Sequence, residues 1–163
     1  MTTLNAKTAD WLAPPRTMLQ SLVLFIIRLY WGWQFFLTGK GKFIDLQKPT
    51  QFFQSLGIPF PHGQAILVGT TECVGGLLLL VGLASRVISI PLMILLMVAY
   101  LTADIDKVKM IFSDPDKFLA ADEFLFLFAA VIVFVFGPGK FSLDWLIARE
   151  LDKRQPEIEP RSV

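Results

Sequence analysis

Two ionisable side chains lie inside apolar runs of this sequence, where a charge is costly. Arg28 interrupts the run over residues 19–37, and Glu72 interrupts the run over residues 65–83. A charge at the centre of a bilayer costs at least about 2.5–3.5 kcal/mol, so neither side chain is expected to face lipid. Counted from residues 37 and 65, which would share one side of a membrane, their depths differ by roughly 3 Å. We therefore predict an Arg28–Glu72 pair inside a helix bundle.

That predicted pair has two interpretations. Ionisable residues inside membranes commonly belong to functional sites, and the pair would then position or protonate a bound ligand. A purely architectural role is the alternative, because breaking a buried ion pair costs roughly 3–5 kcal/mol. In that case Arg28 and Glu72 would only hold their two helices together.

A second set of polar side chains lies at the ends of the apolar runs. These ends are on the side of the membrane that residues 37 and 65 would share. Its members are Lys40, Lys42, His62, Asp104, Asp106, Asp122 and Glu123. With Glu72 below them, these groups would ring a cavity that opens outward. The alternatives are solvated loop charges and, for Asp122 and Glu123, carboxylates that complement a helix N-terminus. A histidine with carboxylates can hold a metal, but no H-x-x-x-H spacing occurs, and we predict no metal site.

Small and aromatic residues accompany these charges. Gly69, Gly75 and Gly76 lie close to Glu72 in sequence and are predicted to pack helices closely together. Cys73, the single cysteine, excludes an intrachain disulfide and is expected to be a small buried hydrophobe. Phenylalanines are frequent in the first and last apolar runs. Packed inside a bundle they would accommodate a flat apolar ligand such as a quinone, although core filling and lipid contact are the ordinary explanations.

The elements that must position these residues are membrane-spanning helices. Hydrophobic residues make up 54% of the 163, charged residues only 18%, and the net charge is +1, which argues against a nucleic-acid partner. Mean hydropathy is +0.58. A helix needs about 20 apolar residues, and roughly 17 can suffice, to cross a bilayer. Four runs approach that length, over residues 19–37, 65–83, 87–101 and 118–136. Because backbone groups in lipid must satisfy one another, we predict four helices.

The connections complete an all-α integral membrane four-helix bundle. Phe52, Phe53 and Leu56 would form one stripe of a short interfacial helix after the first span, with an irregular loop as the alternative. Residues 141–151 are predicted to form a C-terminal amphipathic helix. The chain then divides into a cytoplasmic tail at 1–18, a four-span domain at 19–151 and a disordered tail at 152–163. The side with both tails carries eight Lys and Arg against six, so both termini are predicted to be cytoplasmic.

Four segments together resemble the DoxX family. They are RLYWGWQFFLTGKGKF from Arg28, SLGIPFP from Ser55, TECVGGLLLLVGLASR from Thr71 and FGPGKFSLDWL from Phe136. The resemblance implies a multi-pass protein of the prokaryotic inner (plasma) membrane. The family takes its name from subunits linked to quinol oxidation and to thiosulfate:quinone oxidoreduction, and other relatives are associated with oxidative-stress and thiol complexes. The matching positions that carry candidate functional side chains are Arg28, Lys42 and Glu72.

Together these features predict a membrane subunit of an oxidoreductase system. It would act with a quinone or a redox partner protein through the buried Arg28–Glu72 pair, in the lipid bilayer and as a candidate homo-oligomer. The sequence assigns no catalytic residue and no resident cofactor. The alternative is a non-catalytic membrane scaffold, or a bundle that binds small hydrophobic ligands. A transporter is a weaker third hypothesis, because four spans are few for one chain.

Overall fold

The computed structural model describes residues 18–154, which form helices and, within that range, no strands. In chain order the helices are α2 (Met18–Ile44), α3 (Gln47–Ser55), α4 (Pro61–Val81), α5 (Ser85–Thr102), α6 (Ile105–Lys109), α7 (Pro115–Leu119), α8 (Asp122–Phe136) and α9 (Leu143–Arg154). The all-α prediction is confirmed. The expected cytoplasmic tail lies outside the described residues except for Met18. The expected disordered tail, residues 152–163, also lies outside the described residues, except that α9 continues through residues 152–154.

Three of the described helices, α2, α4 and α5, are long and apolar enough to cross a membrane. Helix α8 is strongly apolar but has 15 residues, which span roughly 22 Å of a hydrocarbon core about 30 Å thick. It begins at Asp122 rather than at residue 118, because Phe118 belongs to the separate short helix α7. A fourth complete crossing therefore stays a prediction.

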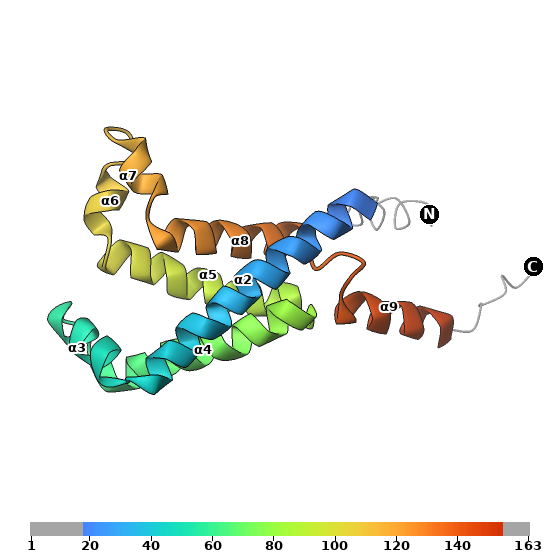
Figure 1. The fold of residues 1–163 in the computed structure, drawn as a ribbon, viewed down its shortest axis with the longest axis horizontal. Coiled ribbons are helices and arrows are strands. Elements are labelled where there is room, and N and C mark those ends of the chain that lie inside the picture. Colours follow the sequence, from blue (N-terminus) through green and yellow to red (C-terminus); the bar gives the residue numbers. More distant parts are fainter. Residues whose placement is uncertain (1–17, 155–163) are drawn as a thin grey trace, which may run out of the picture.

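The bundle consists of two antiparallel helix pairs, α2 with α4 and α5 with α8 (Figure 1). Glycines let α2 and α4 approach closely. A Cβ added at Gly39 would lie 2.5 Å from the backbone nitrogen of Cys73, and one added at Gly76 would lie 2.5 Å from that of Phe36. A Cβ at Gly75 would instead meet Leu92 of α5 at 3.0 Å. Substitution at Gly39 or Gly76 would therefore push α2 and α4 apart.

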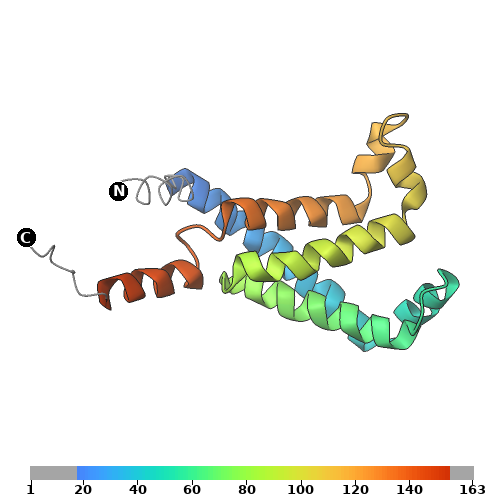
Figure 2. The same ribbon diagram turned by 180° about the vertical axis from the view of Figure 1, so that it is seen from behind.

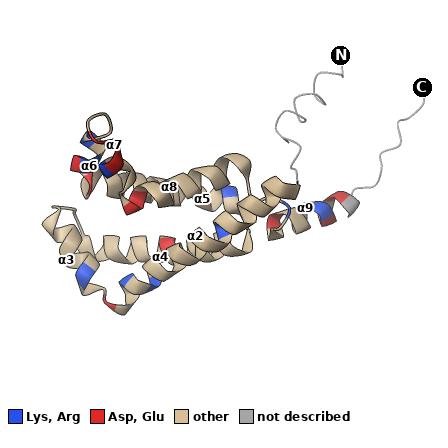
Figure 3. Cartoon of the chain, turned by 45° about the horizontal axis from the view of Figure 1, so that its top comes forward, with Lys and Arg blue, Asp and Glu red and all other residues tan. Residues whose placement is uncertain are grey.

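The pairs meet around a core and have two different ends. The core consists of Phe35, Leu79, Leu92, Leu96 and Val133, drawn from all four long helices. Helices α3, α6 and α7 lie at one end, here called the loop end (Figure 2). The start of α2, the α4–α5 turn and α9 lie at the other, here called the tail end. Seen from the direction of Figure 3, the pair α5–α8 and the pair α2–α4 are separate layers, with α3 and α6–α7 at their loop ends.

Both predicted accessory helices are present. The helix after the first span is α3, which packs against α4. The C-terminal helix is α9, which runs from Leu143 to Arg154 rather than over 141–151. Leu146, Ile147 and Leu151 are exposed on it, as expected of a helix lying in a membrane interface.

Candidate functional site

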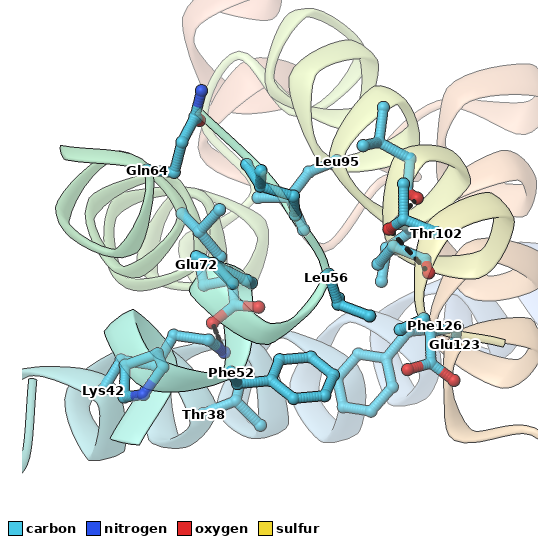
Figure 4. A pocket seen from close by; sticks show the side chains of 18 of the residues that line it. Thr38, Lys42, Phe52, Leu56, Gln64, Glu72, Leu95, Thr102, Glu123 and Phe126 are labelled. Atoms are coloured by element: carbon cyan, nitrogen blue, oxygen red, sulfur yellow. Dashed lines mark hydrogen bonds and ion pairs between the residues drawn. The ribbon is translucent and has the colours of Figure 1, made fainter. Parts of the chain in front are cut away.

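A cavity of about 410 Å³ lies between the two helix pairs at the loop end (Figure 4). Helices α2, α3, α4, α5 and α8 all contribute to its walls. The aromatic part of the lining is Phe35, Phe52, Phe53 and Phe126. The polar part is Thr38, Lys42, Gln64, Glu72, Thr102, Asp122 and Glu123. A mostly apolar space with a few polar groups is the usual composition of a small-molecule site.

The closest charged contact of the cavity joins Lys42 to Glu72. Lys42 Nζ lies 2.5 Å from Glu72 Oε2, and the two side chains are 25% and 8% exposed. Lys42 stands in the last turn of α2 and Glu72 near the middle of α4. The close contact of Gly39 with the backbone around Cys73 places these two positions opposite each other. Backbone packing therefore fixes the positions of Lys42 and Glu72, and their ion pair borders the cavity.

The structure corrects the predicted Arg28–Glu72 pair. Helix α2 runs on to Ile44, seven residues past the expected end, and α4 starts at Pro61, four residues before the expected start. Depths counted from residues 37 and 65 were therefore wrong. In the actual register Arg28 lies against Gly82, which is ten residues, or about 15 Å, from Glu72 along α4.

Arg28 belongs instead to a set of contacts at the tail end, here called the tail-end junction. Its guanidinium Nη2 donates a hydrogen bond to the carbonyl oxygen of Phe141. The Asp144 carboxylate accepts hydrogen bonds from the backbone nitrogens of Ala84, at 2.7 Å, and Ser85, at 3.0 Å. The backbone nitrogen of Asp144 donates to the carbonyl oxygen of Gly82 at 2.9 Å. The junction thus ties α2, the α4–α5 turn and the start of α9 together.

Asp122 and Glu123 both line the cavity, and Glu123 lies on the side opposite Glu72 (Figure 4). They occupy the first turn of α8, where the helix dipole favours negative charge. Glu123 also interacts with Asp104, which forms an ion pair with Lys107 at 3.0 Å. Burial alone would raise the pKa of Asp104, but its hydrogen bonds with Glu123 and Lys107 outweigh burial and lower that pKa. The hydrogen bond to Asp104 raises the pKa of Lys107.

Some polar residues of the predicted ring do not line the cavity. Lys40 and His62 are exposed, and His62 Nδ1 lies 3.5 Å from the hydroxyl of Thr50. Asp106 is exposed and pairs with Lys109 at 3.4 Å. Within residues 18–154, no three His, Cys, Asp or Glu side chains gather closely enough to hold a metal ion.

Sequence reasoning missed Thr38, Gln64 and Thr102 as cavity residues. Their only signal was a polar side chain at the edge of an apolar run, which is common in helices of every kind. The aromatic packing was partly foreseen. The rings of Phe35 and Phe126 meet edge to face at 4.7 Å between centroids, and Trp31 meets Phe126 in the same way at 4.8 Å. Trp31 therefore lies one ring away from the cavity wall.

Comparisons with known proteins find one matching family and a similar bacterial protein. Residues 23–105 match the sequence model of the DoxX family, a stretch that includes Lys42 and Glu72 but ends before Asp122 and Asp144. The chain is also similar to the protein named "Putative oxidoreductase CatD" of Bacillus subtilis (strain 168). The two are 29% identical over 119 residues, which cover 73% of this chain and 82% of that protein. No solved structure matches the chain.

Proposed function

Since this chain belongs to the DoxX family, we propose that it is a membrane subunit of an oxidoreductase system and that its loop-end cavity binds a quinone-type ring. The similarity to a protein named as an oxidoreductase supports the first part. The second part is carried by one observation, the partly buried Lys42–Glu72 pair at the wall of an aromatic cavity. The volume of the cavity, about 410 Å³, falls within the usual range of ligand sites, roughly 300–1,000 Å³.

The lining supplies what such a ring needs. Phe52, Phe53 and Phe126 offer flat apolar surfaces for its faces. Lys42 carries three N–H donors, and Glu72 takes up one of them. The remaining donors would hold a ring oxygen. The Glu72 carboxylate would accept a proton from a ring hydroxyl, so that the pair both orients the ring and exchanges protons with it.

The electrons would come from, or go to, a separate redox partner protein. None of the described residues that line the cavity is a cysteine, tyrosine or tryptophan. We therefore assign the redox chemistry to the bound ring and its partner, with this chain providing binding, orientation and charge. The partner protein is part of the proposal.

Binding of a quinone to purified protein tests this function. Decyl-para-benzoquinone is titrated into the protein in detergent while tryptophan fluorescence is recorded, because Trp31 lies beside Phe126. We expect saturable quenching. Ala99→Phe fills the cavity and should abolish it, whereas Ile94→Phe adds the same ring to an exposed position on the same helix and should not. Equal quenching of both variants, or none in the native protein, contradicts the proposal.

A ligand-binding scaffold without redox activity is the second candidate. The absence of redox-active side chains among the described lining residues favours it equally. The two candidates differ in the fate of the bound ring. In native membranes, an oxidoreductase subunit should accelerate reduction or reoxidation of an added quinone, and a chromosomal deletion should remove that rate. Binding without any effect of the deletion on quinone turnover would favour the scaffold.

We further propose that the protein lies in the prokaryotic plasma membrane with both termini in the cytoplasm. The tail end would then face the cytoplasm and the cavity would lie toward the outer side. Alkaline-phosphatase fusions to either terminus should be inactive, and a fusion in the segment between α3 and α4 should be active. Active fusions at the termini would reverse the orientation.

A further inference from the structure

An apolar groove of about 380 Å³ lies at the tail end, where α9 leaves the bundle (Figure 1). Its walls come from the start of α2, the loop before α9 and the first turn of α9, and we call it the tail-end groove. The lining residues are Met18, Lys140, Phe141, Ser142, Trp145 and Leu146. The groove and the loop-end cavity lie at opposite ends of the molecule, so their ligands would not compete.

The surface of the groove suits a hydrocarbon chain. Met18, Phe141 and Leu146 are exposed apolar side chains. The hydroxyl of Ser142 donates to the carbonyl oxygen of Gly139 at 2.7 Å and accepts from the backbone nitrogen of Trp145 at 3.1 Å, so its hydrogen bonds are made within the protein. Tryptophans gather where hydrocarbon meets water. The groove therefore lies at the depth where lipid headgroups join their acyl chains.

Two cations stand beside this apolar surface. Lys140 is exposed and belongs to the lining of the groove. Arg149 lies over the ring of Trp145, with its Cζ 5.3 Å from the ring centroid. The carboxylate of Asp144, in the same first turn of α9, accepts hydrogen bonds from two backbone nitrogens at the start of α5. The lysine and the arginine can therefore bind an external anion.

Helix α9 as a whole would not distinguish anionic from neutral lipids. Its sequence, LDWLIARELDKR, contains three acidic and three basic residues. A general attraction to an anionic membrane grows with the number of uncompensated Lys and Arg side chains, and here that number is close to zero. A preference for a negative headgroup must come from Lys140 and Arg149 beside the groove.

We propose that the tail-end groove is a binding site for one anionic phospholipid. An acyl chain lies against Met18, Phe141 and Leu146, and the phosphate accepts charge-assisted hydrogen bonds from Lys140 and Arg149. The bound lipid connects the start of α2 with α9 and so reinforces the tail-end junction. This inference does not depend on what the loop-end cavity binds.

Native mass spectrometry of the full chain tests this site. The protein is delipidated in detergent and titrated with phosphatidylglycerol or with phosphatidylcholine that carries the same acyl chains. A basic residue near an anionic headgroup strengthens binding about fivefold. We expect one phosphatidylglycerol per chain, bound at least about tenfold more tightly than phosphatidylcholine. Saturating phosphatidylglycerol should also raise Tm, because a ligand that binds only the folded state stabilises it.

Two variants and two matched controls locate the site. Lys140→Gln should reduce the preference for phosphatidylglycerol about fivefold, and Leu146→Trp, which places a larger ring in the groove, should weaken binding of both lipids. Arg86→Gln removes an exposed cation from the same end of the molecule but outside the groove. Leu151→Trp adds the same ring at an exposed position farther along α9. Both controls should bind lipid like the native protein.

Other occupants would give different results, each of which contradicts the proposal. Equal affinities for the two lipids, or an equal loss of preference in Arg86→Gln and Lys140→Gln, would mean that the groove recognises no headgroup charge. Displacement of the lipid by an equal concentration of inorganic phosphate would indicate a site for free phosphate. A dimer in the same spectra that Leu146→Trp abolishes and Leu151→Trp preserves would show that a second copy covers the groove. The quinone titration of the loop-end cavity is a separate measurement and can succeed or fail independently.

Discussion

Arg28 and Glu72 are both buried charges inside apolar helices, yet their surroundings differ completely. Arg28 is 1% exposed, lies against Gly82 and bonds to a backbone carbonyl. Glu72 forms an ion pair with Lys42, whose side chain is long and flexible, and it borders a cavity of about 410 Å³. A charge fixed to backbone in a packed junction serves the architecture, whereas a charge that faces open space remains available for a ligand. The burial of a charged side chain therefore does not by itself show whether that side chain stabilises the fold or binds a ligand.

The comparison predicts that Arg28→Leu has the largest effect on stability. The substitution leaves the carbonyl of Phe141 without its donor and removes a positive charge that interacts favourably with Asp144. Hydrogen bonds to charged groups contribute about 1.5–3 kcal/mol, and loss of packing adds to this. We expect a free energy of unfolding lower by about 3 kcal/mol or more, measured by thermal or denaturant unfolding in detergent.

Arg86→Leu is the matched control for Arg28→Leu. Arg86 is exposed, and the hydrogen bond that its guanidinium donates to the carbonyl oxygen of Val135 is long, at 3.5 Å. Its removal should change stability by less than about 0.5 kcal/mol. If the two leucine variants were equally stable, the tail-end junction would not have the structural role assigned to it.

Asp144→Ala tests the same junction from its other side, with a smaller effect. The carboxylate accepts hydrogen bonds from two backbone nitrogens at the start of α5. Loss of a comparable helix cap costs about 0.5–2 kcal/mol. We expect a loss of stability in that range, with quinone binding at the loop end unchanged. If the Asp144→Ala protein kept its native stability but lost ligand binding, the tail-end junction and the loop-end cavity would be coupled. Their roles would then not be separate.

Glu72→Gln should lower ligand affinity more than stability, whereas Arg28→Leu should lower stability more than ligand affinity. Lys42 is 25% exposed, so water can solvate its ammonium when the partner carboxylate is gone. The loss of stability should therefore be smaller than for Arg28→Leu, about 1–2 kcal/mol. Affinity for the bound ring should nevertheless fall at least about tenfold, whereas Arg28→Leu protein that remains folded should bind normally. Equal binding by Glu72→Gln and native protein would remove the pair from the site.

The sequence predicted the elements of this molecule better than their register. Apolar runs are sufficient to predict the long helices, because a backbone in lipid has few other options. The stretch from Thr38 to Ile44 was misread, since Lys40, Gly41 and Lys42 are polar or flexible and were expected to end the helix. In the structure that stretch remains helical and packs against α4 through Gly39. This contact involves residues far apart in the chain and leaves no local pattern.

The candidate site shows the same division. Lys42, Glu72, Asp122 and Glu123 were all singled out, because carboxylates and lysines within apolar sequence are conspicuous. Their partners were not predicted correctly. Close packing of Gly39 against Cys73 sets a register in which Arg28 lies against Gly82, about 15 Å from Glu72 along α4. Ionisable residues can thus be found from sequence, whereas the pairs they form depend on the register between helices, which contacts between residues far apart in the chain determine.

Acid should weaken the loop end by a small amount. Asp104 has a pKa below its usual value, so the folded state favours its ionised form. Such a group contributes stability above its unfolded pKa, about 3.9, and loses that contribution as the pH falls through its lower folded pKa. Asp104 is partly exposed, and its interactions with Glu123 and Lys107 are screened by water, so the effect should be under about 1 kcal/mol. Unfolding of native protein and Asp104→Asn, compared from about pH 5 to pH 3, should show the native protein losing its small advantage toward low pH. An advantage that grows as the pH falls would have the wrong sign, and would mean that the contacts of Asp104 with α6 and α8 do not favour its ionised form.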